Sequence, residues 1–262
     1  MATRPDTHDP GPFGTALKAA RSGRRVSQLA LSLDAGVSSR HLSFLESGRA
    51  MPSREMVMTL AEALALPLSA RNQLLNAAGF ASAFPASPLS SEAIAPFRQI
   101  LQTMMANHAP FPALLCDRHW NVLEASPSAA AMLAPFLDGW AGSPNVFRLT
   151  ACHPRAPDLI ANLGQVLHES LERLALEQSL AGDDPVLAEL IAVTRAAAAR
   201  HPYRARTRSP VLPVSYRGPD GPLSFLSVVA QCGTSEDVTV RDLRLELMFP
   251  ADAATRAAFS PS

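Results

Sequence analysis

Hydroxyl and guanidinium side chains are interspersed with leucines between Ser38 and Arg49, in the segment SSRHLSFLESGR. If this segment is a helix, Leu42 and Leu45 share one apolar face and leave a polar outer face. Side chains of these types donate hydrogen bonds to phosphates and to the edges of bases, and a helix fits the major groove of DNA. The chemistry that the segment indicates is therefore DNA binding.

The residues ahead of this helix indicate a second, preceding helix. Apolar side chains continue at the spacing of one helical face, at Leu29, Ala30, Leu33 and Val37. Between the two helices stands Gly36, which can adopt the positive φ that ends a helix, and Ser38 stands where an N-cap residue belongs. Two short helices joined by a glycine turn predict a helix-turn-helix, with a recognition helix over about Ser38–Ser47.

Charge is unevenly distributed along the chain. The 262 residues include 23 Lys and Arg and 23 Asp and Glu, so the formal net charge is zero. Residues 11–80 hold eight of these basic residues and four of the acids, a net charge of +4, and the rest of the chain is correspondingly acidic. The basic excess thus lies in the segment predicted to bind DNA, as contact with phosphates requires. Its modest size favours a domain whose affinity is raised by dimerisation.

The order of residues in this segment resembles the Cro/C1-type (Xre) helix-turn-helix family of bacterial and phage regulators. The matching positions are Ser27-Gln28, Gly36-Val37-Ser38, Leu42-Ser43 and Leu45-Glu46-Ser47-Gly48-Arg49, followed by Pro52-Ser53. The resemblance implies a compact five-helix domain over residues 13–80. Residues 1–12 are predicted to be a disordered tail, and residues 81–92, rich in proline and serine, a linker.

The same resemblance implies which side chains contact DNA. Gln28 should reach a phosphate, and could also brace a side chain of the recognition helix. Arg40, in the first turn of that helix, could donate two hydrogen bonds to O6 and N7 of a guanine. Phe44 either packs on a thymine methyl group or joins the core, and Glu46 is expected to be structural. The predicted contact set is Arg25, Gln28, Ser38, Ser39, Arg40, Ser43, Phe44, Ser47 and Arg49. A solvated helix face is the alternative for its polar members.

A different pattern follows the linker. A helix is predicted over about residues 92–105, and then two strands over 113–116 and 120–124. Further helices are predicted over about 128–133, 157–178 and 185–200, and three further strands over 211–216, 223–232 and 243–250. This element order is that of a PAS-like sheet wrapped around a pocket. The predicted fold class is therefore α+β: an all-α N-terminal domain, a PAS-like domain over 93–250 and a C-terminal tail over 251–262.

Three segments of this second half resemble the ligand-binding domain of MmyB-like transcriptional regulators. They are DRHWNVLEASPSAAAML, NVFRLTACHP and LSFLSVVAQCGTSEDVTVRDLRLELMFPAD. That family joins an Xre-type DNA-binding domain to a C-terminal PAS-like domain, in the order found in this chain. The resemblance covers about residues 95–250 and implies a ligand-responsive regulator. Ser126 stands where many relatives carry asparagine.

An apolar pocket is the expected sensor site of this domain. The candidate lining residues are Leu115, Trp120, Leu123, Met132, Phe136, Phe147, Leu163, Leu167, Phe225 and Val228. Ordinary core packing is the alternative for each of them. An apolar lining favours a small fatty-acid-like or otherwise hydrophobic effector, the class that the resemblance also suggests. Arg148, His153 and Arg155 could bind a carboxylate at the mouth of the pocket, or could be surface charges.

Enzyme functions find little support in the sequence. None of the motifs GxSxG, HExxH, Walker A and GxGxxG is present. Cys152 and His153 are adjacent, which does not suit a nucleophile and its base, and no third metal ligand stands nearby. No catalytic group, cofactor or metal is therefore predicted. Cys116 and Cys232 are expected to be buried, inert thiols, with a redox-sensing cysteine as the alternative.

Cysteine spacing and hydropathy bear on the compartment. The chain has three widely separated cysteines, no apolar leader and no run of about 20 apolar residues, which predicts a protein of the reducing cytoplasm with no membrane segment. The predicted function is that of a ligand-responsive transcription factor, which binds a pseudo-palindromic double-stranded operator as a homodimer. The alternative is a protein-interaction module that keeps the helix-turn-helix fold without binding DNA specifically. Salt-dependent DNA binding would separate the two.

Overall fold

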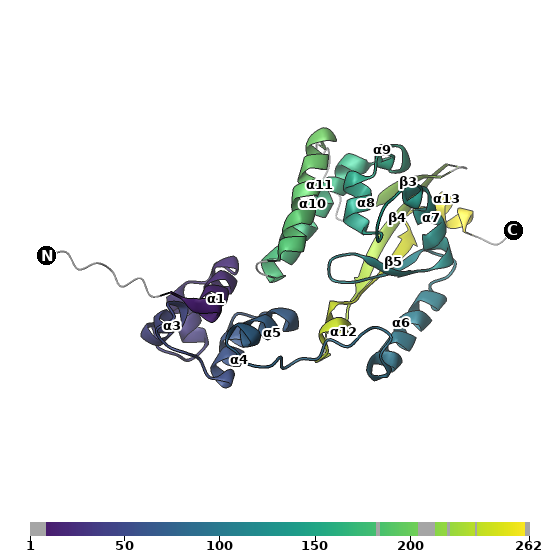
Figure 1. Ribbon diagram of the computed structural model, residues 1–262. Coiled ribbons are helices and arrows are strands. Elements are labelled where there is room, and N and C mark those ends of the chain that lie inside the picture. Colours follow the sequence, from purple (N-terminus) through teal and green to yellow (C-terminus); the bar gives the residue numbers. More distant parts are fainter. Residues whose placement is uncertain (1–8, 182–183, 204–212, 219–220, 234, 260–262) are drawn as a thin grey trace. The chain divides into compact units, whose positions relative to one another are not determined.

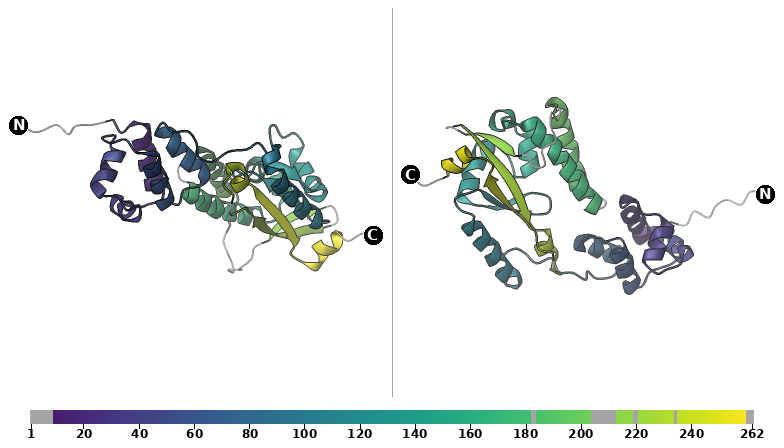
Figure 2. Two further views of the ribbon diagram at one scale, coloured as in Figure 1. Left: turned by 90° about the horizontal axis from the view of Figure 1, so that it is seen from below. Right: turned by 180° about the vertical axis from the view of Figure 1, so that it is seen from behind.

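The computed structural model describes residues 9–181, 184–203, 213–218, 221–233 and 235–259. The chain forms two compact units, one built on the N-terminal helices and the other on a five-stranded sheet. Figure 1 labels the elements, and Figure 2 shows them from two further sides. Among the described helices, none combines the length and the apolar character that crossing a membrane requires.

The N-terminal unit consists of the five helices that the sequence predicts. They are α1 (Gly11–Gly23), α2 (Gln28–Asp34), α3 (Ser39–Glu46), α4 (Arg54–Ala63) and α5 (Leu68–Ala77). A serine caps each of α2, α3 and α4, because its hydroxyl accepts a hydrogen bond from the backbone N–H three residues further on, at 3.0–3.1 Å. Gly36, with a φ of +67°, lies in the turn between α2 and α3, as predicted.

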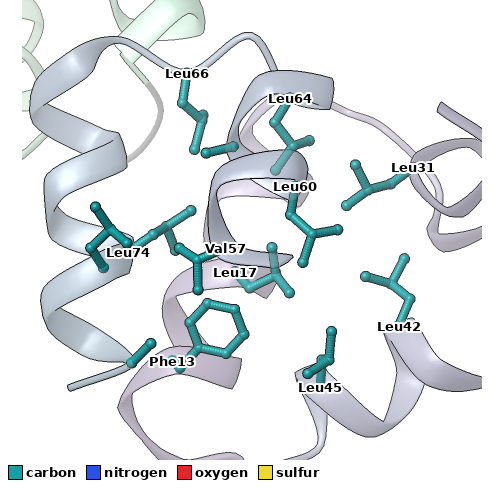
Figure 3. Packing of buried hydrophobic residues seen from close by; sticks show 13 residues of the cluster. Phe13, Leu17, Leu31, Leu42, Leu45, Val57, Leu60, Leu64, Leu66 and Leu74 are labelled. Carbon is teal, nitrogen blue, oxygen red and sulfur yellow. The ribbon is translucent and has the colours of Figure 1, made fainter. Parts of the chain in front are cut away.

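The core of this unit is made mostly of leucines (Figure 3). Its fully buried members include Leu17, Leu31, Leu42, Leu45, Leu60 and Leu75. The expectation that Leu29 and Leu33 share this buried face is wrong, since they are 61% and 72% exposed. α2 is only seven residues long and turns Leu31 toward the core, which places Leu29 and Leu33 on the opposite side.

The C-terminal unit begins with two short strands and the helices around them. In chain order these elements are a 3₁₀ turn η1 (Glu92–Ile94), α6 (Ala95–Asn107), β1 (Ala113–Cys116), β2 (Val122–Ala125), α7 (Pro127–Leu137), α8 (Val146–Cys152), α9 (Ala156–Leu159), α10 (Leu163–Ala181) and α11 (Pro185–Arg200). Three more strands follow: β3 (Val214–Gly218), β4 (Gly221–Ala230) and, after α12 (Val238–Asp242), β5 (Arg244–Pro250). α13 (Ala253–Ala258) comes last.

The sheet has the strand order β2-β1-β5-β4-β3, with antiparallel neighbours throughout. β1 and β5, which are far apart in the sequence, lie side by side, with Leu115 opposite Leu245 and Leu114 opposite Glu246. Because successive side chains of a strand point to opposite faces, Leu115 and Leu245 face one way, and Leu114 and Glu246 the other. The predicted α+β fold class is confirmed.

Helices cover both faces of the sheet. On one face, α6 packs Leu101 and Met105 against Leu115, Leu243 and Leu245. The other face is turned toward α7, α8 and α10, which form a second apolar cluster around Phe136, Leu149 and Leu167. Figures 1 and 2 show α6 on the side of the sheet opposite α8. The sheet thus separates a solid core from a layer of helices that holds a cavity.

Several elements differ from the sequence prediction. The helix expected over 157–178 is interrupted between α9 and α10, because Ile160 pairs with Tyr216 and the N–H of Ala161 donates to the carbonyl of Ser215 at 2.7 Å. The expected C-terminal tail contains α13, whose Thr255 is buried and accepts a hydrogen bond from the N–H of Ser224 at 2.9 Å. Of the strand expected over 211–216, residues 214–216 belong to β3, residue 213 precedes it, and residues 211–212 lie outside the described residues. The predicted domain limits stay predictions.

Candidate functional site

The turn between α2 and α3 is fixed by hydrogen bonds on both sides of Gly36. The backbone N–H of Val37 donates to the carbonyl of Ser32 at 2.9 Å. The hydroxyls of Ser32 and Ser39 are 2.8 Å apart, within hydrogen-bond distance of each other, and join the end of α2 to the first residue of α3. Together with the Ser38 cap, these contacts define the angle at which α3 leaves the turn.

The far end of α3 is held by a buried carboxylate. Glu46 is 5% exposed and accepts two hydrogen bonds from Arg21 of α1, at 2.5 Å from Nε and 2.9 Å from Nη2. Nε2 of Gln28 donates to Oε2 of the same carboxylate at 2.7 Å. The hydrogen bond to Glu46 raises the pKa of Arg21, so the guanidinium keeps its charge. Three helices therefore meet at one ion pair beneath the helix-turn-helix.

Close backbone packing supports the same end of α3. A Cβ atom on Gly14 of α1 would lie 2.8 Å from the carbonyl oxygen of Glu46 and 2.9 Å from that of Leu45. Real side chains do not approach backbone oxygens this closely, so only glycine fits this position. The α1 backbone thus sits directly on the last turn of α3.

The outer face of α3 is polar and exposed. Arg40 and Ser43 are exposed, and Arg49 is exposed just after the helix ends. The ring of Phe44 is half-buried, and the Cζ atom of Arg40 lies 5.3 Å from the centroid of that ring. Phe44 is absent from the described residues that pack on the N-terminal core, which leaves its ring on the polar face. This arrangement presents a guanidinium and an aromatic ring, one turn apart, to a partner.

The C-terminal unit contains a cavity of about 260 Å³ between the sheet and α7, α8 and α10. Its apolar wall includes Leu114, Met132, Phe136, Phe147 and Met248. Its polar wall includes Glu169 and Arg173 of α10, Tyr216 of β3 and Glu246 of β5. A volume near 300 Å³ with a mostly apolar lining and a few polar groups is the form of a small-molecule site.

Two aromatic residues mark the polar part of the cavity. The Cζ atom of Arg173 lies 3.9 Å from the ring centroid of Trp120, close enough for a strong cation–π contact. Burial raises the pKa of the Tyr216 hydroxyl, and the nearby charge of Glu246 raises it further. Tyr216 therefore keeps its proton and remains a hydrogen-bond donor.

Comparison with known protein families covers both units. A helix-turn-helix domain model matches residues 14–79, and the model of the MmyB-like transcription regulator ligand-binding domain matches residues 97–260, more than half of the chain. The chain belongs to the MmyB-like transcription regulators. Its two domains are those of DNA-binding, ligand-binding regulators of transcription, and are typical of regulators rather than enzymes. No curated protein matches the chain.

In this MmyB-like regulator, eight of the nine predicted DNA-contacting residues fall into two groups, and the ninth is the half-buried Phe44. Arg25, Arg40, Ser43 and Arg49 are exposed and available to a partner. Gln28, Ser38 and Ser39 already make the internal hydrogen bonds given above, and the hydroxyl of Ser47 donates to the carbonyl of Phe44 at 3.3 Å. The structure thus gives the second group a part in positioning α3. DNA contact by either group stays a prediction.

Four of the ten residues predicted to line a ligand pocket lie in the wall of this cavity, and their role in ligand binding stays a prediction. Trp120, Met132, Phe136 and Phe147 line the cavity. Four others, Leu115, Leu163, Leu167 and Phe225, are buried but lie outside the lining, in ordinary core. Leu123 and Val228 are 43% and 55% exposed. Strand alternation explains two of these positions, because Leu114 and Ser227 face the cavity and so turn Leu115 and Val228 away from it.

The three polar residues expected at the mouth of the pocket lie elsewhere. Arg148 pairs with Glu189 on the surface. His153 is 5% exposed, and its Nδ1 accepts a hydrogen bond from the N–H of Arg155 at 3.2 Å. None of the three belongs to the described lining of the cavity.

The residues of the polar wall are not among those predicted from the sequence to line a pocket. Val166, Glu169, Ser170 and Arg173 recur at the spacing of one face of α10, and all four line the cavity. Their spacing was visible in the sequence, but a search for apolar residues alone passes over it. Ser126 caps α7 by accepting from the N–H of Ala129 at 3.3 Å and also accepts from the N–H of Ala113 at 2.9 Å.

Proposed function

We propose that this MmyB-like regulator binds a specific operator through the exposed face of α3, and that an effector in the cavity changes this binding. The observation that carries the proposal is the polar face of α3, which is held in place from behind by the buried ion pair between Arg21 and Glu46. A rigidly positioned helix with an exposed arginine in its first turn suits the reading of base edges in the major groove. Chromosomal DNA as partner implies action in the cytoplasm.

The proposal includes a homodimer and an apolar effector. In a two-fold dimer, the two recognition helices would enter successive major grooves about 34 Å apart on a pseudo-palindromic operator. The mostly apolar wall of the cavity supports an effector with an aliphatic body of fatty-acid-like size. Such an effector can act only if it binds the DNA-competent and the incompetent states with different affinities.

The test is a titration of the purified protein onto the DNA upstream of its own gene, at two salt concentrations, read by fluorescence anisotropy and footprinting. The expected result is a footprint with two-fold symmetry and an affinity that falls steeply with salt, because phosphate contacts release counterions. Arg40→Ala serves as the matched variant, since it removes an exposed side chain and leaves the supporting ion pair intact. Equal affinity for operator and unrelated DNA would contradict the proposal.

One observation favours the second candidate, a protein-interaction module. Leu29 and Leu33 lie one turn apart on α2 and are largely exposed, which is the form of a small apolar contact surface. Under this alternative, Leu29→Asn and Leu33→Asn would abolish the activity of the unit in its host, whereas Arg40→Ala would not. The DNA-binding proposal makes the opposite prediction for Arg40→Ala.

A further inference from the structure

The ionisable side chains on the polar wall of the cavity include more acids than bases. Two carboxylates, Glu169 and Glu246, and one guanidinium, Arg173, line it. The hydroxyls of Thr150 and Ser170 already donate to carbonyl oxygens of their own helices, at 2.8 Å and 2.7 Å. The ionisable side chains of the lining therefore carry a net negative charge when all three are charged.

The guanidinium that could attract an anion is already engaged. Arg173 lies face-on to Trp120 at 3.9 Å, and Trp120 itself is 1% exposed. Its positive charge is therefore directed at the π-system of the indole, which compensates part of its lost hydration. A ligand carboxylate would have to compete with this contact and would lie in the same cavity as two carboxylates.

Glu169 lines the cavity with a carboxylate oxygen that needs a hydrogen-bond donor. Its Oε1 atom is buried, and none of the residues that the structure describes donates a hydrogen bond to it. Desolvation by burial raises the pKa of Glu169, and the interaction with Gln165 offsets part of this effect. A buried carboxylate oxygen without a donor is costly, so a ligand that supplies a donor gains affinity at this point.

We propose that the cavity binds an amphiphile with an apolar body and a protonated amine, whose ammonium group donates to Glu169. The proposal rests on the part of the proposed function that makes this cavity the effector site. It retains the aliphatic body expected of a fatty-acid-like effector but replaces the carboxylate head with a cationic one. Met132, Phe136 and Phe147 would hold the body.

Isothermal titration calorimetry with three probes of equal chain length tests this proposal: decylamine, decanol and decanoate. The full chain should bind decylamine at least roughly tenfold more tightly than decanoate, because a charge-assisted hydrogen bond to a partly buried carboxylate is among the stronger polar contacts. Decanol should fall between the two. Equal or tighter binding of decanoate, or no binding of any probe, would overturn the proposal.

The variant Glu169→Gln separates the head group from the apolar body. It keeps the size of the side chain and removes its charge, so the affinity for decylamine should fall roughly tenfold while the affinity for decanol stays similar. Glu172→Gln is the matched control, since it removes an exposed carboxylate from the same helix outside the cavity lining and should change neither affinity. An unchanged decylamine affinity in Glu169→Gln would assign the amine to another site and overturn the proposal.

Operator binding is measured on the same samples without any probe. Wild-type protein and Glu169→Gln should bind the operator alike, because Glu169 belongs to the other unit of the chain. Loss of specific DNA binding in both, with decylamine still bound through Glu169, would contradict the DNA-binding function and leave the amine site standing. Intact specific DNA binding without a preference for decylamine over decanoate would contradict the amine site and leave the DNA-binding function standing.

Discussion

The guanidinium of Arg40 lies over the ring of Phe44, one turn further along α3, with 5.3 Å between Cζ and the ring centroid. An exposed arginine normally samples many rotamers, and ordering it on binding costs free energy. A cation–π contact of this kind is worth about 0.5–1 kcal/mol at an exposed site. Phe44 therefore restricts the rotamers of the Arg40 side chain before DNA binds. The two side chains should contribute to operator binding jointly.

This coupling predicts that Phe44→Ala weakens operator binding roughly two- to fivefold, the equivalent of the lost cation–π contact. In an Arg40→Ala background the same change should cost much less, because the arginine that it positions is gone. A double-mutant cycle measured by fluorescence anisotropy gives the coupling energy. Strictly additive effects would show that the ring and the guanidinium act independently.

Arg40 and Arg25 should differ in what they contribute to affinity. Arg40→Ala is expected to relax specificity at one base pair, at a cost of roughly 1–3 kcal/mol on the preferred sequence. Arg25→Ala, in the exposed turn before α2, should weaken binding to all sequences alike and reduce the salt slope by about one. Binding to a panel of single-base operator variants at several salt concentrations distinguishes them. A base-specific effect of Arg25→Ala would contradict this assignment.

The buried ion pair predicts a large stability effect for Glu46→Gln. This change leaves the guanidinium of Arg21, whose side chain is 13% exposed, without its charge partner, which costs roughly 3 kcal/mol or more. Glu62→Gln is the natural comparison, because Glu62 pairs with Arg71 at 3.6 Å on the surface and should contribute about 1 kcal/mol or less. Urea denaturation followed by circular dichroism measures both. Similar losses in the two variants would show that burial does not strengthen the Arg21 pair.

Gly14→Ala should destabilise the same unit by roughly 1–3 kcal/mol, because the new methyl group would meet backbone oxygens that cannot rotate away. The variant should also weaken operator binding, since the last turn of α3 has to shift. Thr15→Ala, at an exposed position of the same helix, controls for helix propensity and should have little effect. Thermal melts of both variants provide the measurement, and an unchanged melting temperature for Gly14→Ala would contradict the close packing.

The cysteines should differ in reactivity with pH. Desolvation raises the pKa of Cys116, which is fully buried, so its thiol stays protonated and inaccessible across the neutral range. Cys152 is exposed, but partial burial and Glu189 raise its pKa too. Its labelling by iodoacetamide should therefore be slow at neutral pH and accelerate as the pH rises, because the thiolate is the reactive form. Mass spectrometry of native and denatured protein checks this, with Cys116 expected to react only after unfolding.

Local signals made the N-terminal unit predictable from the sequence. Ser38 and Gly36 act through their own backbone and their nearest neighbours, so residue type alone indicates a cap and a turn. α11 was predictable for the same reason, because Pro185 marks its first turn. Local residue types do not predict which side of a strand faces a cavity. The register of β1 against β5 decides whether Leu114 or Leu115 points inward. That register joins residues about 130 positions apart, and no local pattern reports it.

The buried face of α2 was also not predictable from its sequence. Leu29, Leu31 and Leu33 are chemically alike, and a seven-residue helix has too few turns for its period to select among them. Packing against α3 and α4 makes the selection. The polar wall of α10 was equally hidden, because Glu169 and Arg173 read as an ordinary surface pair until the sheet is placed beneath them.

The central position of β5 has a consequence for synthesis on the ribosome. β5 lies between β1 and β4, so the sheet has no centre until its last strand has been made. The five helices α1–α5 and their shared core lie within residues 11–80 and rely on contacts that are near in sequence, which favours rapid folding. The half that reads DNA can therefore fold while the half that senses the effector is still being translated. A chain truncated before residue 244 would keep a folded helix-turn-helix domain but would lack an assembled ligand-binding domain to regulate it.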